Sequence, residues 1–469
     1  MPDQKAFGGG ASGTVLHPFV LVAMLVAIAL ILFLPRKHII VPFILSAILI
    51  PLPQQLYVAG QHVFVLRILI LVGWVRILWA LTTPKTEIVS GKFNIVDKMV
   101  LLWALSRAVA IVLLYKEMPA LTNQVGFLWD SLGAYFLLRF VICDKDDVTR
   151  CIKAFAGVVL ILAITMANEK LRSQNVFGFL GGLPISPDVR EGAIRAQGSF
   201  ATSILAGSFA ATLLPLFVWL WQSRRSRTVA IVGIAGSTGM VLTSASSTPL
   251  LAYLAVIIGL CFWPLRGKMR VIRWVIVIAL ITCHLLMKAP VWFLIAHVDL
   301  VAGNSGYHRA MLIDTFMRHF WDWCLVGTKD TGNWGIDMWD LSNQFVAEGE
   351  VGGLATFIFF VAMISRSFGR IGNSRKRVRG NSGEQWFLWL LGVALFSHCV
   401  AYFGISYFDQ TRVAWFALLA MISAATAPIL AKAKMPQQNA TLDFADSHPA
   451  YATASPSVGS NRELITRGS

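Results

Sequence analysis

Charged residues are scarce in this sequence of 469 residues: only 14% are Asp, Glu, Lys or Arg, while 56% are hydrophobic. Soluble globular domains carry about 25% charged residues, because their surface has to be hydrated. The scarcity therefore excludes an ordinary soluble protein. Together with a mean hydropathy of +0.67, it indicates a chain that lies mainly in lipid.

Several motifs of familiar chemistries are also missing. The six cysteines are scattered without a Cys-x-x-Cys pair, which argues against a disulfide framework and a zinc site. The sequence has no phosphate-binding GxxxxGK[ST] loop and no His-Glu-x-x-His motif. Although the net charge is +16, no basic helix is placed for nucleic acid. We expect no metal, no cofactor and no nucleic-acid partner.

Apolar runs, in contrast, are abundant. A helix that spans a bilayer needs about 20 predominantly apolar residues, since unpaired peptide groups are costly in hydrocarbon. We therefore predict an all-α polytopic membrane protein with about 12–13 transmembrane helices. The predicted spans lie near residues 17–34, 39–52, 63–82, 95–115, 124–143, 151–168, 200–221, 228–243, 248–265, 271–289, 351–366, 385–404 and 412–431.

Basic residues concentrate in alternate loops, as they do on the cytoplasmic side of membrane proteins. This distribution predicts an N-terminus outside, a cytoplasmic C-terminus and two long external loops, 169–199 and 290–350. We expect residues 15–432 to form one transmembrane helical domain. The polar flanks, 1–14 and the cytoplasmic tail 433–469, have compositions typical of disordered segments.

Arginines in the two external loops are candidates for binding an anion, because a guanidinium presents five donors in a rigid fork. Arg190 and Arg195 stand at the membrane edge of the first loop, where anchoring at the lipid headgroups is the alternative. Arg309 and Arg318 lie in the second loop. If that segment is helical, Asp314 shares a face with both, so a salt-bridged surface is the alternative for Arg318.

Arginines within apolar runs are a second group of candidates. A charge inside the bilayer normally lines a cavity or pairs with a carboxylate. Arg67 and Arg107 are deep enough to extend a cationic path, with Asp130 as the most obvious counter-ion. Arg76 and Arg139 stand near cytoplasmic ends, and we expect them to reach the headgroups.

Six short motifs stand in a fixed order along residues 120–425. They are 133–139, Arg195 with Gly198 to Phe200, the Ser/Thr-rich turn Thr243 to Thr248, Arg309, Asn343 to Leu354, and Phe408 to Gln410. Each motif is weak alone, and their order with two external loops is more specific. In this order, the motifs resemble the O-antigen ligase and polymerase superfamily of bacterial envelope proteins.

This resemblance implies a glycosyltransferase bundle of the C type (GT-C-like) in a bacterial inner membrane. It would transfer or polymerise glycans from a polyprenyl diphosphate donor to a saccharide or lipid-linked saccharide acceptor, among membrane lipids and without a metal. Family arginines hold the diphosphate, and here they match Arg195 and Arg309. Asn343 is a further candidate for the cavity.

One position departs from the family pattern. Ligases of this family usually carry a His immediately before the Asn of the last loop motif, and this chain has Ser342 there. A general base must still take the proton of the acceptor hydroxyl. The substitutes near in sequence are Glu348, Glu350, Asp340 and His308, and a structural role at the start of a helix is equally open for Glu350.

Two other functions therefore stay open: a transporter or flippase of lipid-linked glycans, and a family member without catalytic activity. A flippase needs gates on both faces and usually shows internal repeats, whereas this sequence has long loops on one face and no visible repeat. Whether the enzyme would be a ligase or a polymerase is not decided by the sequence.

Overall fold

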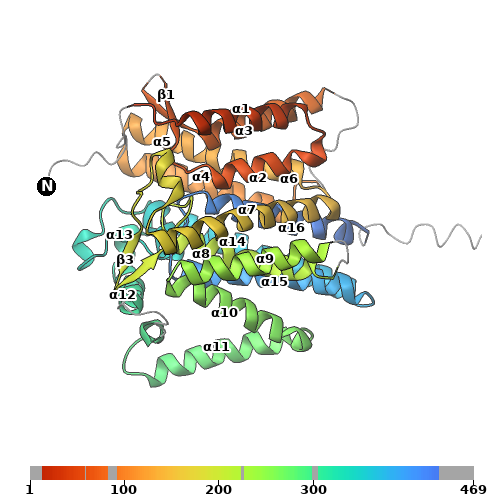
Figure 1. Cartoon of the computed structure of the whole chain (residues 1–469). Helices are drawn as coiled ribbons and strands as arrows, with labels where there is room; N and C mark the ends of the chain where they lie inside the picture. Colours follow the sequence, from red (N-terminus) through yellow and green to blue (C-terminus); the bar gives the residue numbers. More distant parts are fainter. Residues whose placement is uncertain (1–12, 59, 83–91, 223–225, 298–304, 433–469) are drawn as a thin grey trace, which may run out of the picture.

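A computed structural model describes residues 13–58, 60–82, 92–222, 226–297 and 305–432. The described part of the chain is predominantly helical and has only two short hairpins (Figure 1). Each of the thirteen predicted runs coincides with a helical stretch, so these predictions of helix are confirmed. The stretches are α1 (Pro18–Phe33), α2 (Ile40–Leu49), α3 (Val65–Leu81), α4 (Ile95–Tyr115), α5 (Met118–Leu128) continuing through η2 (Trp129–Gly133) into α6 (Ala134–Val141), α7 (Lys145–Arg172), α8 (Ser203–Leu220), α9 (Arg227–Thr243), α10 (Ser247–Cys261), α11 (Met269–Leu286), α14 (Gln344–Arg377), α15 (Ser382–Tyr402) and α16 (Thr411–Lys432).

Within the described residues, seven helices are long and apolar enough to cross a membrane, namely α4, α7, α8, α11, α14, α15 and α16. Three shorter apolar helices, α1, α9 and α10, accompany them. The coarse prediction of an all-α, multi-pass membrane protein is thus supported. The predicted flanks 1–14 and 433–469 fall almost wholly outside the described residues.

Helix α8 lies at the centre of the bundle. It packs against α9, α10 and α15, and nearly all of its side chains are buried. Small residues on its surface allow this close packing: a Cβ on Gly207 would come within 2.7 Å of Pro249 on α10. Helix α11 is the opposite case, since none of its residues is buried and it lies at the lower edge of Figure 1. Its apolar surface is suited to lipid.

Side-chain caps fix where several helices begin. Asn94 and Asp97 form a capping box at the start of α4, Asp144 caps α7 and Thr202 caps α8. Such caps satisfy backbone N–H groups that a helix leaves unpaired in its first turn. Polar residues at the edges of apolar runs therefore set the helix boundaries.

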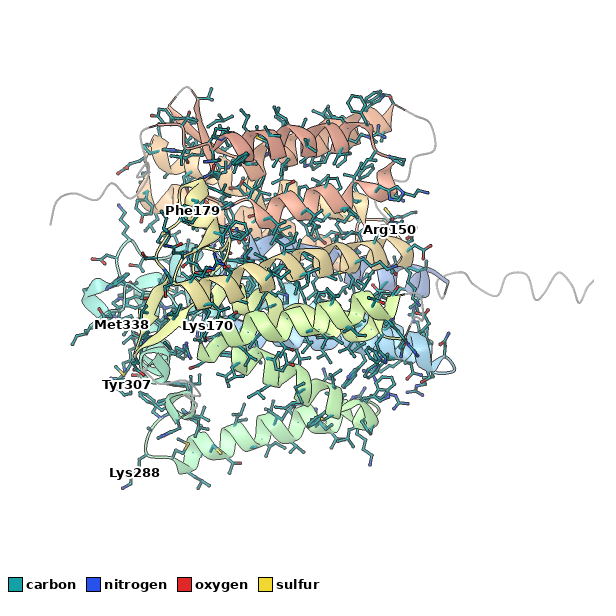
Figure 2. The ribbon with its side chains drawn as sticks, in the orientation of Figure 1. Arg150, Lys170, Phe179, Lys288, Tyr307 and Met338 are labelled. Atoms are coloured by element: carbon teal, nitrogen blue, oxygen red, sulfur yellow. The ribbon has the colours of Figure 1, made fainter. Side chains whose placement is uncertain are left out.

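The two predicted external loops lie at the same end of the bundle, which we call the loop end (Figures 1 and 2). Figure 2 shows Phe179 and Met338 on this side and Arg150 on the other. The loops are more structured than the sequence predicts. They contain η3 (Val176–Leu180), β3 (Asp188–Arg190) paired with β4 (Ala193–Arg195), η6 (Val291–His297), α12 (Ser305–Arg318), α13 (Phe320–Trp323) and η7 (Gly332–Trp334). The remaining short elements are η1 (Arg36–His38), η5 (Trp263–Leu265) and the β1 (Gln55–Val58) and β2 (Gln61–Phe64) hairpin.

Helix α14 begins earlier than predicted, at Gln344 instead of near 351. The Asn343 side chain accepts hydrogen bonds from the backbone N–H groups of Phe345 and Val346, so the polar segment after it is helical. Gly353, with φ of 72°, interrupts the helix. Its Cβ position would lie 2.6 Å from the Leu325 carbonyl oxygen, so glycine is required there by both conformation and space.

Candidate functional site

Segments distant in the sequence are hydrogen-bonded to one another at the loop end, and the loop after α15 (residues 403–410) links them. The Asp409 carboxylate accepts from the backbone N–H of Ala201, and Gln410 donates to the Ser199 carbonyl. On its other side, the backbone N–H of Tyr407 donates to Gln344 at the start of α14. Four of the motifs noted in the sequence therefore belong to one connected region.

Arg195, on β4, is held firmly at this end. One Nη donates to the Ser246 hydroxyl at 2.7 Å, and the other pairs with Asp188 at 3.0 Å. The Arg195 side chain is only 12% exposed, whereas Asp188 is 61% exposed. Burial lowers the pKa of Arg195, Asp188 raises it, and the nearby charge of Arg190 lowers it further. The charged guanidinium is thus incompletely compensated, and an added anion would stabilise it.

Hydrogen bonds of the residues that follow Arg195 in the chain fix its position. Its backbone neighbour Ala196 donates to the Thr243 carbonyl, which joins β4 to the Ser/Thr-rich turn before α10. On the other side, the Glu169 carboxylate accepts from the backbone N–H groups of Gln197 and Gly198. Glu169 is fully buried, and sequence reasoning missed it because it looked like the polar end of an apolar run.

Glu348 is completely enclosed at the start of α14. Its Oε1 accepts from Gln344 at 2.6 Å and its Oε2 accepts from the Trp103 indole at 2.8 Å. Arg107 on α4 lies 3.7 Å from the same Oε2. Both oxygens of the Glu348 carboxylate are therefore occupied by donors from the protein.

Glu350 is in the opposite situation. It is 1% exposed, and neither of its carboxyl oxygens has a hydrogen-bond partner among the described residues. Its backbone carbonyl accepts from Thr328, so the segment after α13 is held against this point of α14. Burying a carboxylate without hydrogen-bond donors costs free energy. Such a group is able to exchange a proton with a nearby hydroxyl.

The arginines within the helices have partners, as the sequence suggests for one of them. Arg67 donates to both oxygens of Asp130 at 2.9 and 2.8 Å, which confirms the predicted counter-ion. Asp130 lies in η2, a π-helical turn between α5 and α6. Arg107, for which the sequence also suggests Asp130, pairs instead with Glu348 and stacks on the Phe127 ring at 4.5 Å. Both ion pairs lie within electrostatic range of Arg412 on α16.

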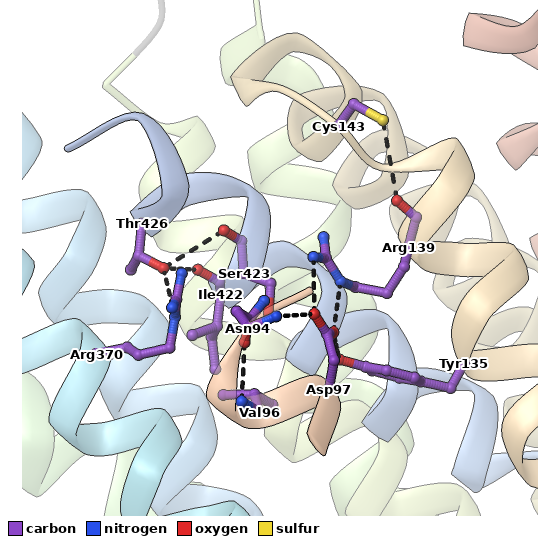
Figure 3. Close-up of polar contacts among 10 residues, drawn as sticks. All are labelled: Asn94, Val96, Asp97, Tyr135, Arg139, Cys143, Arg370, Ile422, Ser423 and Thr426. Carbon is purple, nitrogen blue, oxygen red and sulfur yellow. Dashed lines mark hydrogen bonds and ion pairs between the residues drawn. The ribbon is translucent and has the colours of Figure 1, made fainter. Parts of the chain in front are cut away.

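Arg139 does not reach the headgroups, so that expectation is wrong. Its side chain is fully buried and pairs with Asp97, which also accepts from the Tyr135 hydroxyl at 2.6 Å (Figure 3). Asp97 lies at the first turn of α4, far along the helix from its loop-end terminus at Tyr115. The motif at 133–139 is therefore not brought to the loop end with the others.

The remaining predicted residues are distributed as follows. Arg309 is buried on α12, at 6% exposure. Arg318 has a 73% exposed side chain and forms an ion pair with Asp314 one turn earlier, as its spacing suggests for a salt-bridged surface. His308 lies 3.0 Å from the Asp337 carbonyl, and Arg190 is exposed on β3. Asn343 caps α14.

A pocket of about 220 Å³ opens beside the Arg107 pair. It lies between the last turns of α4, the second half of α5 and the segment after α13. Its lining combines an arginine, two amides, a hydroxyl and two aromatic rings with apolar side chains: Arg107, Ile111, Leu114, Tyr115, Asn123, Gln124, Phe127, Thr328 and Val351. The sequence could not reveal it, because its walls come from α4, α5, the segment after α13 and α14.

No group of three or more His, Cys, Asp and Glu side chains is arranged to hold a metal ion in the described part of the chain. The chemistry available at the loop end is that of arginines, carboxylates and amides. Neither the models of known protein families nor the curated proteins match this sequence.

Proposed function

We propose that this protein is a glycosyltransferase of the bacterial inner membrane that transfers or polymerises glycans from a polyprenyl diphosphate donor. The observation that carries the proposal is the convergence of Arg195, the Ser/Thr-rich turn, the start of α14 and the 403–410 loop at one end of the bundle. These segments carry the resemblance to the O-antigen ligase and polymerase superfamily. Independent motifs without a shared role have no reason to meet.

Arg195 has the properties expected of a residue that binds the diphosphate. Its two Nη groups are held by Asp188 and Ser246, so the side chain is positioned in advance. Its exposed partner, Asp188, is readily displaced or joined by a second anion. As the anomeric carbon–oxygen bond breaks, the diphosphate leaves with the electron pair, and a fixed guanidinium stabilises the charge that develops. We assign the same role, binding of the diphosphate, to Arg309.

Glu350 is the group best suited to act as the general base. Glu348 is saturated by donors, whereas the Glu350 carboxylate has none among the described residues. In the transfer step, the acceptor oxygen bonds to the anomeric carbon and its proton moves to Glu350. Glu350 thereby takes the role that Ser342 cannot perform unaided.

The architecture proposed for this function has 12–13 spans arranged as in C-type glycosyltransferases. In this orientation the loop end faces outward and the basic loops face the cytoplasm. The donor would reach the loop end sideways from the bilayer, because its polyprenyl tail stays in lipid. The shared placement of both long loops supports this orientation.

The test is glycan analysis of the host envelope and secreted polysaccharide with Arg195→Ala, Arg309→Ala and the double variant. Arg318→Ala is the matched control, because this arginine is exposed and paired on α12. We expect polymeric glycan to disappear and lipid-linked precursor to accumulate in the first three strains at normal membrane abundance. Unchanged glycan in the double variant would contradict the proposal. A protein that binds the donor without turning it over would indicate a family member without catalytic activity.

A further inference from the structure

The proposed diphosphate and proton-transfer roles do not use the pocket beside Arg107. It is bounded by the last turns of α4, the second half of α5 and the segment that contains Thr328. Val351, the residue after Glu350, also lines it, so the pocket lies next to the proposed general base. Its volume of about 220 Å³ is sufficient for one small ring.

The two arginines at this pocket are already paired. Arg107 faces the Glu348 carboxylate at 3.7 Å, and Arg67 nearby is paired with Asp130 through two hydrogen bonds. The one further cation that the described residues place against the lining is Lys329, over the Tyr115 ring at 5.2 Å, and it is exposed, so water and salt screen its charge. An anion would therefore gain little from Arg107. The chemistry favours a neutral ligand.

Two polar atoms of the pocket residues lack a hydrogen-bond partner within the described part of the chain, and they indicate which neutral functional group would bind. The Arg107 Nε is a buried donor, and the Gln124 Oε1 is a buried acceptor; neither has a partner among the described residues. Gln124 itself is 3% exposed and donates its amide to Asn123 at 2.9 Å. A hydroxyl group both accepts and donates a hydrogen bond, so it is able to satisfy a buried donor or a buried acceptor.

Both atoms belong to lining residues and are inaccessible to solvent, and side chains of binding sites commonly turn when a ligand enters. The Phe127 ring, on which Arg107 stacks at 4.5 Å, and the half-buried Tyr115 ring supply flat apolar surface. Rings beside amides and a guanidinium form the usual combination for a molecule that has apolar C–H faces and hydroxyl edges.

We propose that the pocket lined by Arg107, Gln124, Phe127 and Thr328 binds one sugar ring of the acceptor glycan through its hydroxyl groups. The binding of a saccharide is independent of catalysis, and its assignment to the acceptor rests on the proposed function. Thr328 and Val351 join the pocket to the Glu350 segment, so a ring seated here would extend toward the proposed base.

Binding is measured by saturation-transfer NMR on the full chain in lipid nanodiscs, with methyl glycosides of glucose, galactose, mannose, rhamnose and N-acetylglucosamine as probes. At least one glycoside should receive saturation from the wild-type protein. We expect Gln124→Leu and Arg107→Lys to reduce that signal at least fivefold. Thr122→Val is the matched control, because Thr122 is exposed on the same helix and bonds only within it.

Two results would overturn the proposal: no probe binds the wild-type protein, or Gln124→Leu binds as the wild type does. Displacement of the glycoside by millimolar inorganic phosphate would also overturn it, since that result indicates an anion site. Arg107→Lys separates loss of binding from loss of folding, because lysine keeps the positive charge beside Glu348.

The experiment separates this inference from the proposed function. Retained glycoside binding, with host glycans unchanged in the Arg195→Ala and Arg309→Ala double variant, leaves a saccharide site in a protein that is not the proposed transferase. Conversely, loss of glycan in the double variant, with normal glycan in Gln124→Leu, leaves the transferase and removes the acceptor site.

Discussion

Two buried carboxylates at opposite ends of the bundle show how differently this chain treats the same chemical group. Asp97, at the first turn of α4, accepts from the Tyr135 hydroxyl and Arg139 through one oxygen, and from the Asn94 backbone and Arg139 through the other (Figure 3). Glu350, at the loop end, has no partner for either oxygen among the described residues. Both are essentially inaccessible to solvent.

The difference separates stability from reactivity. Burying an ionised carboxylate is expensive, and Asp97 offsets that cost with a full set of donors. Glu350 has no hydrogen-bond donors among the described residues, so burying its charge destabilises the fold at this position. Uncompensated polar groups of this kind concentrate at functional sites, where their protonation or ligand binding relieves the strain.

The largest effect is expected from Asp97→Ala. This substitution leaves the Arg139 guanidinium buried at 0% exposure without its counter-ion. Breaking a buried ion pair costs about 3–5 kcal/mol, so membrane abundance and the detergent melting temperature should both fall sharply. Asp146→Ala, in the exposed first turn of α7, is the control and should cost less than about 1 kcal/mol. Normal abundance of Asp97→Ala would contradict a structural role.

Glu350→Gln should show the reverse pattern. The amide has nearly the same shape and carries no charge to bury, so the melting temperature should stay the same or rise. Loss of a general base lowers a reaction rate about 10²–10⁴-fold, so transfer of glycan in membrane vesicles should nearly stop. Glu348→Gln supplies the comparison, because it removes the charge that Arg107 faces and should lower stability more. Full activity of Glu350→Gln would remove it from the mechanism.

The sequence predicts the helices well and the site only in part. Apolar runs identify the helical stretches because lipid demands continuous backbone hydrogen bonding. They do not reveal that Asn343 starts α14 early, since Gln344 to Glu350 is polar and becomes helical through tertiary contacts. The counter-ion Asp130 was predictable because few carboxylates lie within apolar runs. The pocket at Gln124 was not, because its walls come from segments about 200 residues apart along the chain.

Arg195→Lys tests whether the loop end needs a guanidinium or only a positive charge. Lysine keeps the charge but cannot hold Asp188 and Ser246 with two separate Nη groups. A charged hydrogen bond contributes about 1.5–3 kcal/mol, which corresponds to about a tenfold to hundredfold slower transfer. Accumulation of lipid-linked precursor at normal membrane abundance is the measurement. Wild-type turnover would mean that this arginine only anchors the loop.

The smallest effect is expected from Arg318→Ala. This arginine pairs with Asp314 on one face of α12, but its side chain is 73% exposed. Exposed ion pairs contribute between about 0 and 1 kcal/mol, because water and salt screen them. Neither the melting temperature nor the envelope glycans should therefore change measurably. A strong loss of glycan with this variant would contradict the distinction between buried and exposed groups. It would show that an exposed, paired arginine matters as much as a buried one. The cationic surface used by the donor would then extend along α12, beyond the segments that the 403–410 loop brings together.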